Sequence, residues 1–119
     1  MVIFSILSYR FNTYPEEVIA VGLIFIDPKT DNFKFKVSDL KMKIASKVLP
    51  TKKHVFKLFK NTVDQMLKSD GWTCQTLDRS HRYQNGLIKW SKPSEISTTL
   101  DGFDQVFKKW IEKQFNIED

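Results

Sequence analysis

VIFSILSYRF, at residues 2–11, and VIAVGLIFID, at residues 18–27, are the two stretches that decide the fold of this 119-residue chain. Both are rich in Val, Ile, Phe and Tyr, residue types that fit a pleated and half-buried surface. A short polar connection, NTYPEE at residues 12–17, joins them. Because each stretch is apolar on both faces, the two predict an antiparallel pair of strands at the centre of a small sheet.

Two residues within this pair are candidates for function. Gly22 interrupts the second strand, where strict alternation puts residues 19, 21, 23 and 25 on one face and the even-numbered residues on the other. A glycine inside a strand marks a bulge or the close approach of another backbone, and a ligand contact is the alternative. Arg10 is a charge at the end of an otherwise apolar strand.

The middle of the chain predicts a third strand and two helices. FKFKV at residues 33–37 follows a Pro/Asp/Asn turn and alternates as a strand with one wet face. Apolar residues at helical spacing, with Leu40 and Ile44 among them, then predict a short helix to about residue 48, capped by Ser38 or Asp39. A longer helix follows, capped by Thr51, with Gly71 as the left-handed residue at its C-terminal end and Trp72 packed back onto it.

The last third predicts a loop, a strand and a helix. Residues 73–85 are polar and predict a loop, with at most a short strand near Cys74. LIKW at residues 87–90 predicts a fourth strand, ended by Pro93 and loosely extended by Ile96. One apolar face from residue 100 to 115 predicts a C-terminal helix capped by Thr99 or Asp101.

These elements together predict one α+β domain over residues 1–119. We expect an antiparallel sheet of three to four strands, a meander plus a late strand, packed against two or three helices.

Composition limits the class of protein. The chain is 41% hydrophobic, with ten Phe, and 28% charged, which indicates a packed domain rather than a disordered one. Its single cysteine, Cys74, can form neither an internal disulfide nor a cysteine zinc cluster. Ser5, Ser8 and Arg10 interrupt the N-terminal apolar run, so we expect no signal peptide, no membrane span and a cytoplasmic location.

No spacing of residues predicts catalysis, a metal site or a cofactor. The two histidines, His54 and His81, form no metal-type pair, and the four glycines form no phosphate-binding loop. Cys74 and His81 are conceivable as a thiol and its base, but a lone cysteine is more often a small buried hydrophobe. We therefore expect no enzyme, no metal and no cofactor.

Charged residues near the predicted loop form one further cluster. Arg79, His81 and Arg82, with Asp78, are the densest group of titratable residues outside a periodic element. Loops often carry sites, although a solvated polar loop is the simpler interpretation. An enzyme that acts through Arg10, His81 or Arg82 is the most remote of the functions considered.

Positive charge is concentrated in one segment. The net charge is +5, but residues 34–60 hold nine lysines against one acid, Asp39. The helical lysines of this segment lie largely off the apolar stripes, so they predict either a basic surface for phosphate or acidic protein, or only a solvated face. The phenylalanines there fall on the core side, which argues against base stacking. The candidate binding residues are Lys41, Lys43, Lys47, Lys52, Lys53, Lys57 and Lys60.

Three stretches resemble a known family. They are FSILSYRF at residues 4–11, EVIAVGLIF at 17–25 and LIKW at 87–90, followed by SKP and an apolar C-terminal helix. In this order they resemble the small bacterial domain-of-unknown-function family 3037, over about residues 4–115. The chain departs from the family pattern at Phe11, where Tyr is usual, and at Ala20, where Asn is usual, which puts any binding role of that Asn in doubt.

The resemblance implies an α+β domain encoded beside kinases similar to the toxin HipA. We therefore expect a non-catalytic protein-interaction module in a toxin–antitoxin type system, with a HipA-like kinase as its protein partner. The alternative is a nucleic-acid-binding protein that uses the basic 34–60 region.

Overall fold

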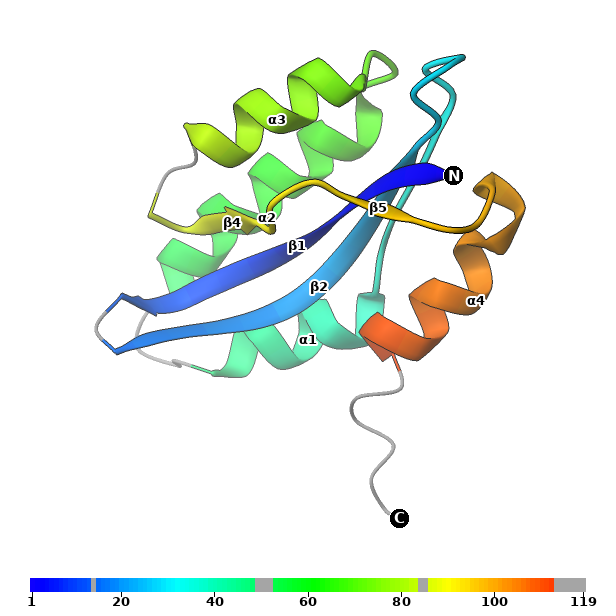
Figure 1. The fold of residues 1–119 in the computed structure, drawn as a ribbon. Helices are drawn as coiled ribbons and strands as arrows, with labels where there is room; N and C mark the ends of the chain where they lie inside the picture. The colour runs from blue at the N-terminus through cyan, green and yellow to red at the C-terminus, as the bar shows by residue number, and fades with distance from the viewer. Residues whose placement is uncertain (14, 49–52, 84–85, 113–119) are drawn as a thin grey trace.

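Antiparallel strands form the centre of the molecule, five of them within the described residues. The computed structural model describes residues 1–13, 15–48, 53–83 and 86–112 (Figure 1). The strands are β1 (Val2–Thr13), β2 (Glu16–Ile26), β3 (Phe33–Val37), β4 (Ile88–Trp90) and β5 (Ser94–Ile96). Their order is β3-β2-β1-β4, with β5 also paired to β1. The predicted α+β fold, with a meander and a late strand, is thus confirmed, and the long hairpin β1–β2 is central.

A bulge at Gly22 changes which residues of β2 face each side of the sheet. Leu7 pairs with Gly22 but Ser8 pairs with Ala20, so β2 carries one extra residue at this point. Val21 consequently packs on the same side as Ile24, and Leu23 packs on the other. The expected strict alternation through β2 was therefore wrong, whereas the structural role of Gly22 is confirmed.

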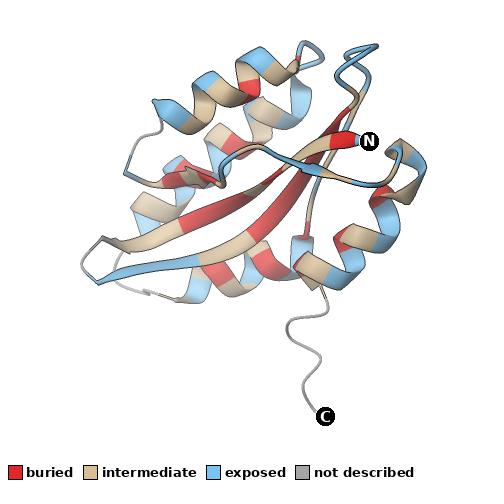
Figure 2. Ribbon diagram, in the orientation of Figure 1, coloured by how far each residue is buried: buried red, intermediate tan, exposed pale blue. Residues whose placement is uncertain are grey.

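The sheet separates two apolar cores. The helices α1 (Asp39–Lys47), α2 (Lys53–Lys68) and α3 (Cys74–Arg82) contribute to the first core, which includes Tyr9, Phe59, Leu77 and Trp90. The second core contains Phe25, Phe103, Phe107 and Ile111 and lies under the C-terminal segment. In Figure 1, α2 lies on the far side of the sheet and α4 on the near side. Buried residues follow the middle of β1 and β2 between them (Figure 2).

Residues 73–85 do not form the loop that the sequence predicted. The described part of this stretch is mainly α3, which begins with a capping box. The Thr73 hydroxyl accepts from Thr76 N at 3.1 Å, and Thr73 N donates to Thr76 Oγ1 at 2.8 Å. Residues 84 and 85 lie outside the described residues.

The end of α2 also differs in detail from the expectation. No described glycine has a positive φ, so Gly71 is not the left-handed terminator that was predicted. Trp72 does pack back on α2, where its Nε1 donates to the Met66 carbonyl at 3.4 Å. The predicted cap Thr51 lies outside the described residues.

The predicted C-terminal helix consists of three short segments. They are a 3-10 turn η2 (Leu100–Gly102), α4 (Phe103–Phe107) and a π-helical turn η3 (Lys108–Glu112). Thr99 stands at the N-terminal position, but among the described residues its side chain makes no capping hydrogen bond. The apolar face is as expected up to Ile111, and Phe115 lies outside the described residues.

Two serines hold the passage from β4 to β5 against β1. Ser91 N donates to the Ile6 carbonyl at 2.9 Å, and Ile6 N donates to the Ser91 hydroxyl at 2.8 Å. The buried Ser5 hydroxyl donates to the Ser91 carbonyl at 2.6 Å. The Ser91 position that carries part of the family resemblance therefore has a structural role here.

Candidate functional site

A groove between α1 and α2 combines apolar and charged side chains. On α1, Asp39, Met42, Lys43 and Ser46 share one face by their helical spacing. On α2, Phe56 and Lys60 lie one turn apart and complete a groove of about 360 Å³. Half-buried Met42 and Phe56 supply the apolar surface, whereas exposed Lys43 and Lys60 supply charge.

Two exposed leucines lie on the same two helices, outside the residues that line the groove. Leu40 is 51% exposed and shares a face of α1 with Lys43 and Lys47. Leu67 is 45% exposed and lies three turns along α2 on the side that carries Phe56 and Lys60. We call this set the α1–α2 surface; its members are Leu40, Met42, Lys43, Lys47, Lys53, Phe56, Lys57, Lys60 and Leu67.

The structure keeps most of the predicted basic residues on the outside. Lys43, Lys47, Lys53, Lys57 and Lys60 are exposed. Lys60 forms an ion pair with Asp64 at 3.4 Å, which reduces the positive charge of this side of α2. Lys52 lies outside the described residues.

Lys41 is not on the surface, contrary to the prediction. It is fully buried, and its Nζ donates to the Ala20 carbonyl at 3.3 Å. Burial lowers the pKa of the Lys41 ammonium. The reason for the error is the rotation of α1: its inward residues are Lys41 and Ala45, whereas Leu40 points to solvent.

Arg10 belongs to an ion cluster on the sheet. Its Nε lies 3.1 Å from Glu16 Oε2, and Lys89 Nζ donates to Glu16 Oε1. The hydrogen bond from Lys89, followed by the charges of Lys89 and Arg10, lowers the pKa of Glu16. Glu16 and Lys89 were not among the predicted residues, because their proximity depends on strand register: Lys89 pairs with Ser8 across β1 and β4.

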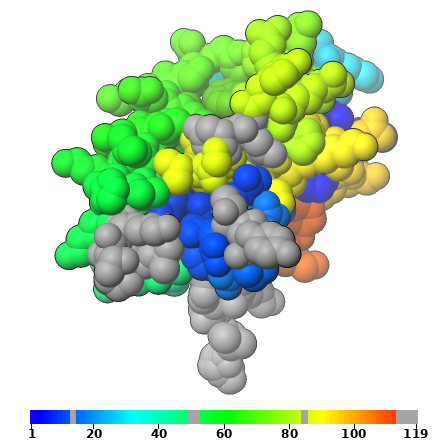
Figure 3. All heavy atoms as spheres, turned by 90° about the vertical axis from the view of Figure 1, so that its left-hand side faces the viewer, coloured from blue at the N-terminus to red at the C-terminus, as the bar shows by residue number. Residues whose placement is uncertain are grey.

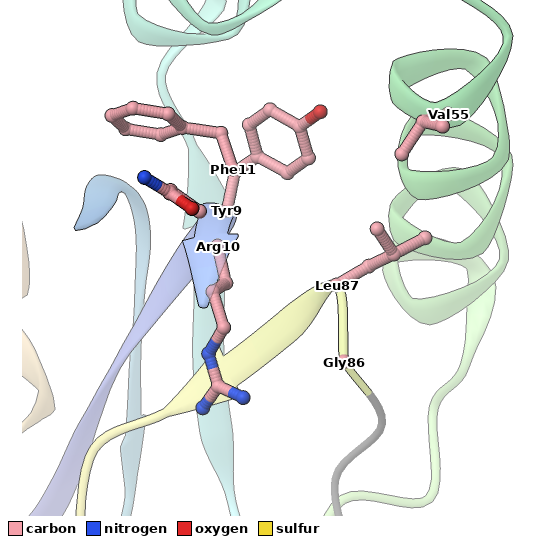
Figure 4. Close-up of a pocket in the computed structure, with 7 residues that line it drawn as sticks. Tyr9, Arg10, Phe11, Val55, Gly86 and Leu87 are labelled. Atoms are coloured by element: carbon pink, nitrogen blue, oxygen red, sulfur yellow. The ribbon is translucent and has the colours of Figure 1, made fainter. Parts of the chain in front are cut away.

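The charged residues of α3 have separate partners. Arg82 Nε pairs with Asp78 at 3.0 Å one turn earlier, and His81 Nδ1 lies 2.8 Å from the Trp90 carbonyl. Arg79 is exposed. Arg10 extends from β1 on the side opposite Tyr9 (Figure 4), whereas α3 packs in the first core with Tyr9. The structure therefore does not bring Arg10 together with His81 and Arg82.

Cys74 and His81 do not form a thiol–imidazole pair. They occupy the two ends of α3, seven residues apart, or about 10.5 Å along the helix axis. Burial, and then the nearby charges of Asp31 and Asp27, raise the pKa of the Cys74 thiol. The thiol is therefore protonated and not activated at neutral pH.

A second hollow lies at the end of the sheet, where β1 approaches α2. A pocket of about 160 Å³ is lined by Tyr9, Arg10, Phe11, Asn12, Val55, Gly86 and Leu87. Figure 4 shows the rings of Tyr9 and Phe11 on one side of β1, with Val55 on α2 and the Leu87 side chain directed toward that helix. From this end of the molecule, β1 lies at the surface between α2 and the segment leading into β4 (Figure 3).

In the part of the chain that the structure describes, no three His, Cys, Asp or Glu residues are grouped so that they could hold a metal ion. No helix within these residues is long and apolar enough to cross a membrane.

Comparison of the chain with protein-family models, curated proteins and solved structures finds no match. The resemblance to family 3037 therefore stays a prediction.

Proposed function

We propose that this chain is a small cytoplasmic protein-interaction module, without a catalytic step of its own, that binds its partner through the α1–α2 surface. The observation that carries the proposal is the exposure of Leu40 and Leu67 among lysines on the two helices that border the groove. Exposed apolar side chains surrounded by polar ones are typical of protein interfaces. A site for phosphate backbones needs the charges but gains little from the leucines.

The charge and the apolar groove of the α1–α2 surface indicate which kind of partner surface would fit it. The exposed Lys43, Lys47, Lys53 and Lys57 favour an acidic surface, which would speed association and fix orientation. The apolar surface of Met42 and Phe56 favours one or two apolar anchors inserted into the groove. On the resemblance to family 3037, a HipA-like kinase is the first partner to test.

The proposal is tested by affinity purification of the full chain from its native host, with nuclease present throughout. We expect a specific protein to be recovered with the wild type and lost with the double variant Lys43→Glu, Lys60→Glu. The control is Leu58→Asp, because Leu58 is 58% exposed but lies about 160° around α2 from Lys60. Recovery of the same proteins by all three chains would contradict the proposal.

The second candidate is nucleic-acid binding, favoured by the same exposed lysines. If four of them contact phosphates, the affinity for duplex DNA falls about a hundredfold between 50 and 200 mM salt. A fluorescence anisotropy titration of a labelled duplex measures this directly. Absence of binding at the lower salt concentration excludes this function.

A further inference from the structure

The pocket at the end of β1 has walls made of aromatic and aliphatic side chains. Tyr9 and Phe11 on β1 both pack in the first core and so lie on one side of the sheet. The Tyr9 ring is fixed by contacts with Phe59 and Phe56, at centroid distances of 4.7 and 5.5 Å. Val55 on the first turns of α2 and Leu87 before β4 add aliphatic surface (Figure 4).

Arg10 and Asn12, which border the pocket, already have partners. Arg10 extends to the other side of the sheet, where it pairs with Glu16, and its backbone N donates to the Leu87 carbonyl at 2.8 Å. The Asn12 amide donates to Glu17 Oε1 at 2.9 Å. Burial raises the pKa of the Tyr9 phenol, so this group is neutral at neutral pH. A charged ligand would find its counter-charges held elsewhere, whereas a neutral apolar one needs none.

An irregularity of the sheet lies beside this hollow. The pairing of β1 with β2 shifts between Arg10 and Asn12, so Phe11 is an extra residue in β1. The described pairing of β1 with β4 extends only to Tyr9 and Ile88. Bulges are frequent beside binding sites, because they redirect side chains and end strand pairing.

The size of the pocket sets the size of the ligand. An apolar cavity of about 150 Å³ admits one benzene molecule, and this pocket measures about 160 Å³. We propose that the pocket formed by Tyr9, Phe11, Val55 and Leu87 binds one neutral, phenyl-sized ring, carried either by a free small molecule or by an apolar side chain of another polypeptide. The proposal does not depend on the α1–α2 surface.

NMR titration of the full chain, labelled at Val and Leu methyl groups, tests the ligand class. Toluene represents the free ring, N-acetyl-phenylalanine amide the ring on a polypeptide, and benzoate a charged ring. We expect both neutral compounds to shift the Val55 and Leu87 methyl signals, and benzoate to bind at least about tenfold more weakly than toluene. Stronger binding of the amide identifies a polypeptide side chain as the source, and stronger binding of toluene a small molecule.

Absence of shifts at Val55 and Leu87 with both neutral compounds, up to their solubility, would overturn the site. Binding of benzoate as tightly as toluene would overturn the preference for a neutral ring.

A variant that fills the pocket tests its location. Val55→Phe is expected to weaken toluene binding at least about tenfold, while Gln65→Phe, which adds a ring at an exposed position about 15 Å farther along α2, leaves it unchanged. If Val55→Phe lowers the melting temperature, Val55→Met is the second variant, because a flexible Met fills the same space with less strain. Unchanged toluene binding in a folded pocket-filling variant would contradict the proposal.

Discussion

Gly22 shows how a single residue adapts the central hairpin to its neighbours. A Cβ at this position would lie 3.0 Å from the Lys36 carbonyl oxygen and 3.1 Å from Val37 Cγ2 on β3. The Lys36 carbonyl oxygen is a backbone atom within the paired strands β2 and β3. It therefore has little freedom to move away from an added Cβ. The glycine thus allows β3 to lie close against β2 where Gly22 pairs with Val37.

We predict that Gly22→Ala destabilises the fold by about 1–3 kcal/mol, as overpacking in a core does. Gly71→Ala is the matched control, because a Cβ there meets no described atom within 4 Å and its φ is not positive. The control should change the free energy of unfolding by less than about 1 kcal/mol, in the stabilising direction. Urea denaturation measures both, and equal effects of the two substitutions would contradict the role given to Gly22.

Lys41 gives a prediction that depends on pH. Burial lowers the pKa of Lys41 in the folded chain, so the unfolded chain binds this proton more tightly. The contribution of Lys41 to the free energy of unfolding therefore increases with pH. The increase takes place between the lowered pKa of the folded chain and the ordinary lysine pKa of about 10.4. Lys41→Met removes this contribution.

We expect the stability of the wild type relative to Lys41→Met to increase between pH 7.5 and pH 10. Urea denaturation of both chains at several pH values in this range measures the difference. A difference that is constant or that decreases with pH would show that burial of Lys41 does not lower its pKa.

At the scale of elements, α3 shows what a single sequence leaves undetermined. Its only buried residue is Leu77, so the sequence shows no apolar stripe that would predict a helix. Its Cys, Thr, Asp and Ser residues are also weak helix formers. Its start is set by the reciprocal hydrogen bonds of Thr73 and Thr76, with Thr in the place where Glu or Gln is usual in a capping box. The strands β1 to β4 and the helix α2, which have clear apolar patterns, were predicted, whereas β5 was expected only as a loose extension of β4 through Ile96.

Thr73→Ala is expected to destabilise the chain by about 1 kcal/mol, because it removes the cap of α3. Thr99→Ala is the matched control: Thr99 also precedes a helical segment in extended conformation, but among the described residues its side chain forms no capping bond. The control should change stability by less than about 0.5 kcal/mol. Thermal denaturation compares them, and a loss in Thr99→Ala as large as in Thr73→Ala would contradict the capping role.

The rotation of an element matters as much as its existence. The short helix α1 was predicted at the correct place, and its cap, Ser38, was one of the two that were expected, yet the prediction put Lys41 outside. The buried side of α1 carries Lys41 and Ala45 rather than the apolar stripe that begins at Leu40, so tertiary contacts with β2 decide which side is buried. For the same reason the composition predicted a basic surface but could not tell which lysines belong to it.

At the scale of the whole molecule, the candidate sites arise between elements that are distant in sequence. The α1–α2 groove depends on how two helices pack, the pocket on the meeting of β1, α2 and Leu87, and the ion cluster on the register that puts Lys89 beside Glu16. None of these distances can be obtained from spacing along the chain. The lysines and Arg10 could be predicted as candidate site residues from the sequence. The candidate roles of Leu40, Leu67, Val55 and Leu87 follow only from their positions in the fold.

The central claim is that the α1–α2 surface binds a protein partner through its apolar side chains as well as its charges. Once affinity purification has identified the partner, isothermal titration calorimetry of the purified pair tests this claim with Leu67→Asp and its control Leu58→Asp, both exposed leucines of α2. We predict that Leu67→Asp weakens binding at least about tenfold, because it puts a desolvated charge in the interface, and that Leu58→Asp binds as the wild type does. Equal affinities for all three chains would contradict the account.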